Sequence, residues 1–399
     1  RTPQSSVVLD GSVRLDDQVA EVENPLALSG AISLPEILSF ASPDSPLTAE
    51  GTIALAGRFR GTLEKPDPTL DVTLSGAGLD HPELNVTVSG VQAGIHFENG
   101  LIRLENTEAR FGPASFTATG TLPLSVVWKD HPFPSPPDDQ GPAKFRLAVD
   151  DFQMRAFRAF PEEMDAFTSF TIEGQAETVE GIEGVKAELQ IPQLDVKYND
   201  FSLAPRNPLV ARLENGVVTV QPSVLSGPSS RLELRGTAEL TGEQKLNLAL
   251  SGDASAALFT LFAPEGQFGG RTQLEVVVGG TTSDPALSGF FALNNGLASF
   301  RDPRIDFSNL DVRVNLEGRS LSVERFRGAL NGGTIEIGGG MAFEQNKPLI
   351  PNITITAKNV FVDVGDLQTV SDHDLRIVGE EERIFVRGQS KLRNALLRG

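Results

Sequence analysis

The chain has 399 residues, a formal net charge of −19 and no cysteine. The acidic balance argues against nucleic-acid binding, which needs clustered lysine and arginine. The missing cysteine excludes disulfides, thiolate metal sites and cysteine nucleophiles, and it fits a periplasmic protein. Phe occurs 24 times beside one Trp and one Tyr, so the apolar surface is aliphatic and phenylalanine-rich with few polar handles.

Neither a membrane-spanning run nor a signal peptide is visible in the sequence. The pattern of short apolar runs is already under way at Arg1 and still continues at Gly399. We therefore expect the chain to be one piece of a longer protein, with the targeting segment and any inner-membrane anchor elsewhere.

Internal repeats organise the chain. Similar stretches run over residues 98–124, 214–240 and 316–343, with a partial copy over 10–34. Each has a turn at Asn-Gly or Glu-Gly, a strand, a glycine-containing loop and a second strand. We expect one continuous elongated repeat domain over 1–399, with units near 1–34 (partial), 35–124, 143–240, 241–343 and 344–399 (partial).

Brief helical segments are expected between the strand series. The predicted segments are Pro35–Phe40, Asp151–Phe167, Ala254–Phe262 and Val364–Val370. The second of these has phenylalanines at roughly helical spacing, which suits a helix flanking the core or a gate for an apolar ligand. The proline-rich stretch 130–142 cannot be a central strand, so we expect an exposed loop there.

Apolar residues alternate with polar ones along almost every predicted strand, so each strand has one apolar face. Aligned by repeat, the apolar positions fall in matching columns, and we predict that they line one surface. They are Leu70, Val72, Leu74, Leu84, Val86, Val88, Ile102, Leu104, Phe116, Leu122, Leu124, Val218, Val220, Leu232, Leu234, Leu240, Leu246, Leu248, Leu250, Val312, Val314, Leu316, Leu321, Val323, Ile335, Ile337, Met341, Phe343, Ile353 and Ile355.

These columns predict an all-β protein built from one long, mostly antiparallel sheet with an apolar face. Such a face must be covered, and the predicted helices are too short to cover it. Either the sheet folds over on itself or apolar ligands fill the space. About two dozen strands at roughly 4.8 Å each would span on the order of 115 Å.

Chemistry-bearing motifs are sparse. His81, His96, His131 and His373 are scattered without ligand spacing, and His96 is expected at an outward polar position. Residues 371–374 and 16–17 match no calcium loop and suit turns, whereas Asp150–Asp151 suits a helix N-cap. Gly338–Gly340 ends a strand without opening a phosphate-binding helix. We expect no enzyme activity, no cofactor and no metal.

The sequence order supports a family resemblance. The stretch from Val276 to Gly339 contains a G-T-x-x-D-P-x-L-x-G step, an N-L-x-V-x-V-x-L-x-G step and a G-G-x-x-x-x-x-G step. In this order and recurrence the chain resembles the TamB family, the translocation and assembly module proteins related to AsmA-like proteins. The pattern is clearest over 236–343, and the family's N-terminal anchor has no counterpart in this sequence.

That resemblance implies a long curved sheet folded lengthwise into an open trough (a β-taco), apolar inside and polar outside. It implies a periplasmic bridge that moves phospholipids or other acyl-chain lipids between inner and outer membranes. In some members it also implies assembly of outer-membrane proteins with a TamA-like barrel partner. Two other readings remain open: a structural or assembly module that holds strands by edge pairing, and a closed β-solenoid adhesin or polysaccharide enzyme.

Overall fold

The structure is a computed structural model, and it describes residues 5–15, 20–42, 45–62, 65–126, 128, 133–134, 136, 141–158, 164–177, 181–198, 201–261, 263–342, 350–364, 367–380 and 383–397. Within this part of the chain, 23 strands form one antiparallel sheet, accompanied by a single α-helix and short 3-10 segments. The predicted all-β class is therefore confirmed. The chain divides into two compact units, which are described separately.

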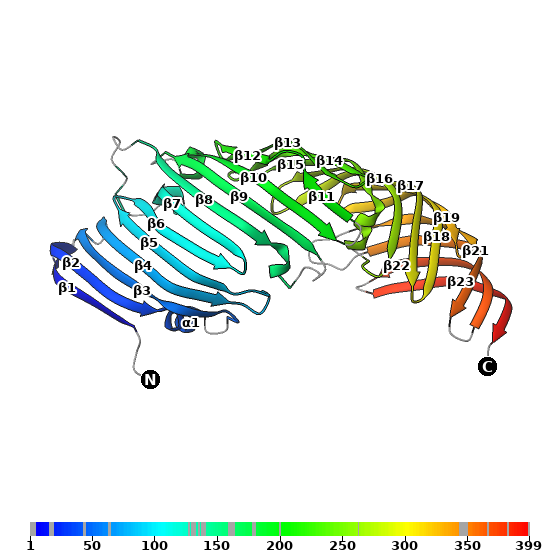
Figure 1. Ribbon diagram of the computed structural model, residues 1–399, viewed down its shortest axis with the longest axis horizontal. Coiled ribbons are helices and arrows are strands. Elements are labelled where there is room, and N and C mark those ends of the chain that lie inside the picture. Colours follow the sequence, from blue (N-terminus) through cyan, green and yellow to red (C-terminus); the bar gives the residue numbers. More distant parts are fainter. Residues whose placement is uncertain are drawn as a thin grey trace. The chain divides into compact units, whose positions relative to one another are not determined.

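The first unit holds the strands of the N-terminal half. Each strand from β1 to β9 pairs antiparallel with the next, and β10 pairs with β9 and with β12. Figure 1 shows β3, β4, β5 and β6 lying side by side in chain order. The strands are β1 (Ser6–Leu15), β2 (Ala20–Ser33), β3 (Thr48–Gly61), β4 (Pro66–Asp80), β5 (Val88–Glu98), β6 (Leu101–Phe111), β7 (Ala114–Pro123), β8 (Ala143–Gln153), β9 (Asp165–Ala176), β10 (Val185–Tyr198) and β12 (Leu209–Glu214).

The second unit is a meander that continues in the same style. Each strand from β14 to β23 pairs antiparallel with the next, and β11 (Phe201–Pro205) pairs with β13 (Val217–Gly227). The strands are β14 (Ser230–Glu239), β15 (Leu246–Ser255), β16 (Gln267–Gly280), β17 (Pro285–Arg301), β18 (Arg304–Gly318), β19 (Ser320–Leu330), β20 (Gly333–Ala342), β21 (Ile350–Val364), β22 (Leu367–Glu380) and β23 (Arg383–Leu397).

Asn-Gly turns join strands at equivalent places in the repeats. Asn99 and Asn215 both have positive φ, at 50° and 51°, and a glycine follows each of them. Two successive positive-φ residues suit the type I′ turn, whose twist matches that of the flanking strands. In both copies the chain closes on this turn, because Leu124 N donates to Gly100 O and Leu240 N donates to Gly216 O, each at 2.8 Å.

Two of the four predicted helical segments are helical over most of their length in the described residues. Helix α1 (Leu34–Ala41) covers the first, and a six-residue 3-10 segment, η5 (Ala256–Leu261), covers the third. The prediction of helix over 151–167 is wrong: β8 continues to Gln153, a 3-10 turn η3 (Met154–Ala156) follows, and β9 begins at Asp165. The prediction over 364–370 is also wrong, because β22 begins at Leu367. Phenylalanine and valine favour strands, and pairing with neighbouring strands overrides a short helical spacing.

Three smaller predictions change for the same reason. Asp151 does not cap a helix but lies in β8 with a φ of 58°, at a register shift against β9. Residues 371–374 are not a turn and lie within β22, and Gly338–Gly340 lie inside β20. Asp16–Asp17 and His131 lie outside the described residues.

Glycines inside the strands allow neighbouring backbones to approach closely. Gly252, Gly289 and Gly339 have φ values of 138°, 125° and 101°, which side-chain-bearing residues rarely adopt. A Cβ at Gly289 would meet the carbonyl oxygen of Glu275 on the adjacent strand. Each of the three pairs with a large apolar residue on a neighbouring strand, as Gly289 pairs with Val276 and Leu316. Such glycines bend and coil a sheet without interrupting its pairing.

Candidate functional site

The strand register in the first unit places apolar residues in continuous rows across the sheet. One row passes from Leu55 on β3 to Val72, Ile95 and Leu104 on the next three strands, and then to Gly120 and Phe145. A second row joins Leu28, Gly57, Leu70, Phe97, Ile102 and Leu122. Paired residues share a face in an antiparallel sheet, so these rows form one apolar surface.

The second unit repeats this arrangement over more strands. We call the apolar row that crosses β14 to β21 the aliphatic row. Its members are Leu234, Leu250, Val276, Gly289, Leu316, Leu321, Met341 and Pro351. A parallel row on the same face joins Leu232, Gly252, Leu274, Phe291, Val314, Val323, Gly339, Ile353, Ile377 and Val386.

Beside the aliphatic row the same face is packed into a core, which we call the aromatic band. Leu293, Leu310 and Val312 are its buried centre, at 6%, 5% and 6% exposure. Phe259 of η5 lies over it, 5.0 Å from Phe291 and 5.8 Å from Phe268 between ring centroids. The other aromatic members are Phe300, Phe307 and Phe326. The side chains of the aliphatic row, by contrast, are partly exposed except for the buried Pro351.

The first unit has a matching closed region. Phe111 and Ala114 are buried beneath Ala156 of η3, and Phe152 and Phe157 pack against them. Leu84 and Val86 belong to this cluster although they lie outside the strands, where Leu84 makes an isolated bridge to Phe157. The short 3-10 segments thus cover only part of the apolar face.

Most of the predicted lining residues are brought onto these faces. Leu70, Val72, Leu74, Val88, Ile102, Leu104, Phe116 and Leu122 lie on the apolar face of the first unit. Leu232, Leu234, Leu246, Leu248, Leu250, Val312, Val314, Leu316, Leu321, Val323, Ile335, Ile337, Met341, Ile353 and Ile355 share the apolar face of the second. Val218 and Val220 occupy alternate positions on β13.

A few predicted positions differ. Leu124 has left the strand and begins a 3-10 turn, and Leu240 follows the end of β14 and is 42% exposed. The backbone N–H of each of these two leucines donates a hydrogen bond to the glycine of an Asn-Gly turn, and this contact takes both residues out of the regular strand alternation. Phe343 lies outside the described residues.

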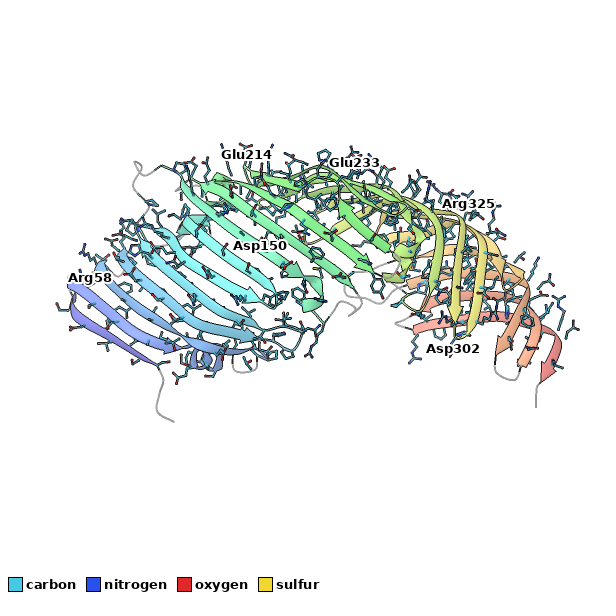
Figure 2. All side chains as sticks on the ribbon, viewed as in Figure 1. Arg58, Asp150, Glu214, Glu233, Asp302 and Arg325 are labelled. Carbon is cyan, nitrogen blue, oxygen red and sulfur yellow. The ribbon has the colours of Figure 1, made fainter. Side chains whose placement is uncertain are left out.

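The opposite face carries charged ladders. Asp311 contacts Arg325 at 2.9 Å and Arg327 at 3.1 Å, and Glu324 accepts hydrogen bonds from Arg313 and Asn315. The hydrogen bond from Asn315, with help from Arg313, lowers the pKa of Glu324 below its ordinary value. The labelled Glu233 and Arg325 belong to this polar face (Figure 2).

His96 lies on the polar face of the first unit, as predicted. Its Nδ1 is 2.7 Å from Asp71, and Glu98 lies 3.6 Å from Nε2. The hydrogen bond to Asp71 raises the pKa of His96 above its ordinary value, against a smaller opposing effect of burial.

The part of the proline-rich stretch that the structure describes matches the expected exposed loop only in part, because Pro134, Gly141 and Pro142 are exposed whereas Phe133 packs against the sheet. Phe133 contacts Phe97 edge-on at 5.3 Å, and Trp128 contacts Phe133 at 6.0 Å. Pro136 is buried. Aromatic contacts of this geometry stabilise beyond the area that they bury, so this segment is held against Phe97, an inner member of a first-unit row.

Cavities lie mainly away from the aliphatic row. One of about 1240 Å³ lies beside η5 and the ends of β16 to β18, with Phe268 and Phe307 in its wall and Glu265 and Arg301 at its edge. One of about 530 Å³ lies on the polar face between Asp311 and Lys358. Among the described residues, no three His, Asp or Glu side chains are grouped as a metal ion would require.

The sequence reasoning missed residues on the apolar face that interrupt or extend the columns. Val276, Leu274, Phe291 and Phe97 extend the rows, and His373 is a polar member of the same face on β22. The signal for His373 was present, because it shares sequence parity with Leu375 and Ile377.

No helix in the described part of the chain is long and apolar enough to span a membrane. Comparisons with family models, with curated proteins and with solved structures return no match to this chain. The resemblance to TamB stays an expectation from the sequence, and the function has to be argued from the sheet itself.

Proposed function

We propose that the apolar face of this sheet binds acyl chains and that the protein conducts phospholipids between the inner and outer membranes, as a periplasmic bridge. The observation that carries the proposal is the aliphatic row, in which apolar residues follow one another across eight strands without a charged member. The TamB-like order of motifs in the sequence supports the same function.

The dimensions and energetics suit an acyl chain. Eight strands at about 4.8 Å spacing give the row a length of roughly 34 Å, and one acyl chain is about half of a hydrocarbon core of roughly 30 Å. Each CH₂ removed from water contributes about 0.8 kcal/mol. A surface that is apolar and continuous would hold a chain without fixing its position, which is what movement along the sheet requires.

The first experiment is organic-solvent extraction of the purified protein followed by mass spectrometry. We expect phospholipid in stoichiometric amount. Leu234→Arg should remove lipid because it places a cation in the aliphatic row, and Ile337→Asp should also remove it because it places an anion on the same apolar face, outside that row. Asn247→Arg is the matched control, since it adds the same charge on the other face of the adjacent strand. Equal lipid in Leu234→Arg and Asn247→Arg would refute the proposal.

A second candidate function is an assembly module that holds strands of outer-membrane proteins, alone or with a TamA-like barrel partner. Exposed apolar residues on β23 favour it, because Ile384, Val386 and Leu392 are 62%, 64% and 57% exposed. A partner strand added to a sheet can cover such residues while pairing with the edge. A lipid-free extract from folded protein, with a bound polypeptide in its place, would favour this function.

A further inference from the structure

His373 stands out on the apolar face of the second unit. Among the described residues of β14–β23 that share the face of Leu232 and Leu234, it is the only ionisable side chain. It pairs with Ala357 on β21 and with Ser390 on β23. Among these described strand residues, His373 is thus the position at which the apolar face can acquire charge.

Two serines hold the imidazole in place. Ser371 Oγ lies 2.7 Å from Nε2 of His373, and Ser390 Oγ lies 2.8 Å from Nδ1. Ser371 is fully buried and its hydroxyl also reaches Val360 O at 3.3 Å, whereas Ser390 is exposed. The inner end of this hydrogen-bond chain is therefore fixed in the sheet, and the outer end faces solvent.

The protonation state of the His373 imidazole determines which hydrogen-bonding groups the solvent-facing end of this chain presents. A protonated ring donates from both nitrogens, so both serine oxygens become acceptors and both hydroxyl protons must point elsewhere. The Ser371 proton has Val360 O, and the Ser390 proton is left to donate outward. The protonated cluster thus presents a positive charge and a free donor, which is the combination that an oxyanion accepts.

The surroundings do not neutralise that charge on the same face. On the β21 side His373 pairs with Ala357, next to Val360, which pairs with Ser371. On the β23 side it pairs with Ser390, which is flanked on the same face by Gly388 and Leu392. Asp372 and Asp374 of β22 point to the other face, where Asp372 is bound by Arg393 at 2.7 Å and Lys391 lies opposite it.

Next to the cluster the face is again aliphatic. Leu375 pairs with Ile355, and Ile377 pairs with Ile353 and Val386. We propose that Ser371, His373 and Ser390 form a subsite for the anionic end of an amphiphile whose chain lies along Leu375 and Ile377. This inference rests on the proposed binding of acyl chains, and it adds that the head of the ligand is an oxyanion held best when the imidazole is protonated.

The test is calorimetric titration with three probes below their micelle concentrations. They are 1-decanesulfonate, whose charge does not change with pH, the uncharged decyl maltoside, and ethanesulfonate, which has the head without the chain. Since histidine gains charge as pH falls from about 8 to about 5.5, decanesulfonate should bind about tenfold more tightly at the lower pH through a charge-assisted hydrogen bond. Decyl maltoside should bind equally at both, and ethanesulfonate should not bind.

Two histidine variants separate the local charge from the charge of the whole protein. His373→Gln should abolish the pH effect on decanesulfonate and leave decyl maltoside binding unchanged. His96→Gln is the matched control, because it removes a strand histidine from the polar face of the sheet, and it should retain the pH effect. Ser390→Ala should weaken decanesulfonate binding several-fold at the lower pH, because the outward donor is lost.

The possible results distinguish failure of the subsite from failure of the proposed acyl-chain binding. Amphiphile binding with the same pH effect in wild type and His373→Gln would overturn the subsite and leave the proposed function standing. A pH effect on decyl maltoside, or ethanesulfonate binding as tightly as decanesulfonate, would also overturn it. If neither decyl amphiphile binds, the acyl-binding function fails together with the subsite. Circular dichroism of each variant confirms that the fold is intact.

Discussion

The aromatic band and the aliphatic row lie on the same face of the same strands, yet they differ in how they are covered. Strand β18 passes through both: Leu310 is 5% exposed in the aromatic band, whereas Leu316 in the aliphatic row is only partly buried. The 3-10 segment η5 brings Phe259 over the band. An apolar face can therefore be buried core in one part and partly exposed surface in another, and local packing of the 3-10 segment distinguishes the two.

The difference in packing between the two regions is tested most directly by truncating one leucine in each region of β18. Leu310→Ala should lower the free energy of unfolding by about 2–5 kcal/mol, because it leaves a cavity in a packed core. Leu316→Ala should cost only about 1 kcal/mol, because its side chain loses little buried area. Chemical denaturation of both variants measures the difference. Equal losses would show that the aliphatic row is packed as core in solution.

Binding should show the opposite order. Leu316→Ala and Leu310→Ala can both be titrated with decyl maltoside. Only Leu316→Ala, the variant in the aliphatic row, should bind this ligand more weakly than the wild type does. A loss confined to Leu310→Ala would place the ligand over the aromatic band and contradict the proposed site.

A second prediction concerns the glycines that shape the aliphatic row. Gly289→Ala should destabilise by about 1–3 kcal/mol, because alanine is strained at a φ of 125° and its Cβ would meet the backbone of β16. Gly279→Ala on β16 is the control, since a Cβ there meets nothing closer than 3.9 Å. It should be neutral or slightly stabilising, by about 0.4–1 kcal/mol at most. Thermal unfolding of the pair measures this contrast, and equal effects would argue against a bend at Gly289.

The smallest expected effect lies on the polar face, where His96 binds Asp71. Because the pKa of His96 is raised in the folded state, its contribution to stability is fully present below the ordinary histidine pKa of about 6.5. That contribution is lost as the pH rises through the raised value. His96→Gln should therefore be less stable than wild type in mild acid, and the two should converge in alkaline solution. Denaturation curves across this range would reveal it, and a gap that widened with pH would contradict the assignment.

These predictions distinguish residues proposed to bind a ligand from residues that only stabilise the fold. The aliphatic row should tolerate an exchange of one aliphatic residue for another, because a chain that slides along it needs only an apolar surface. The aromatic band should not tolerate changes in volume, because its members interdigitate at the density of a protein interior.

The class of fold and the composition of the apolar face follow from patterns that are local in the sequence. Successive side chains of a strand point to opposite sides, so the alternation at Val312, Val314 and Leu316 already placed these residues together. The Asn-Gly turns at Asn99 and Asn215 were readable for a similar reason, since few residues accept positive φ. Both signals depend only on neighbours along the chain.

Tertiary packing determines which apolar residues are covered and where a polar residue such as His373 lies on the apolar face. Leu310 and Leu316 look alike in sequence, but Leu310 belongs to the buried cluster that also contains Ala256 of η5 and against which Phe259 packs, and this packing makes Leu310 core. The helix expected over residues 151–167 became two strand ends and a 3-10 turn, because pairing with neighbouring strands outweighs local spacing. His373 gained its place between Ser371 and Ser390 only through the register of β22 with β23, a long-range pairing that no local pattern specifies.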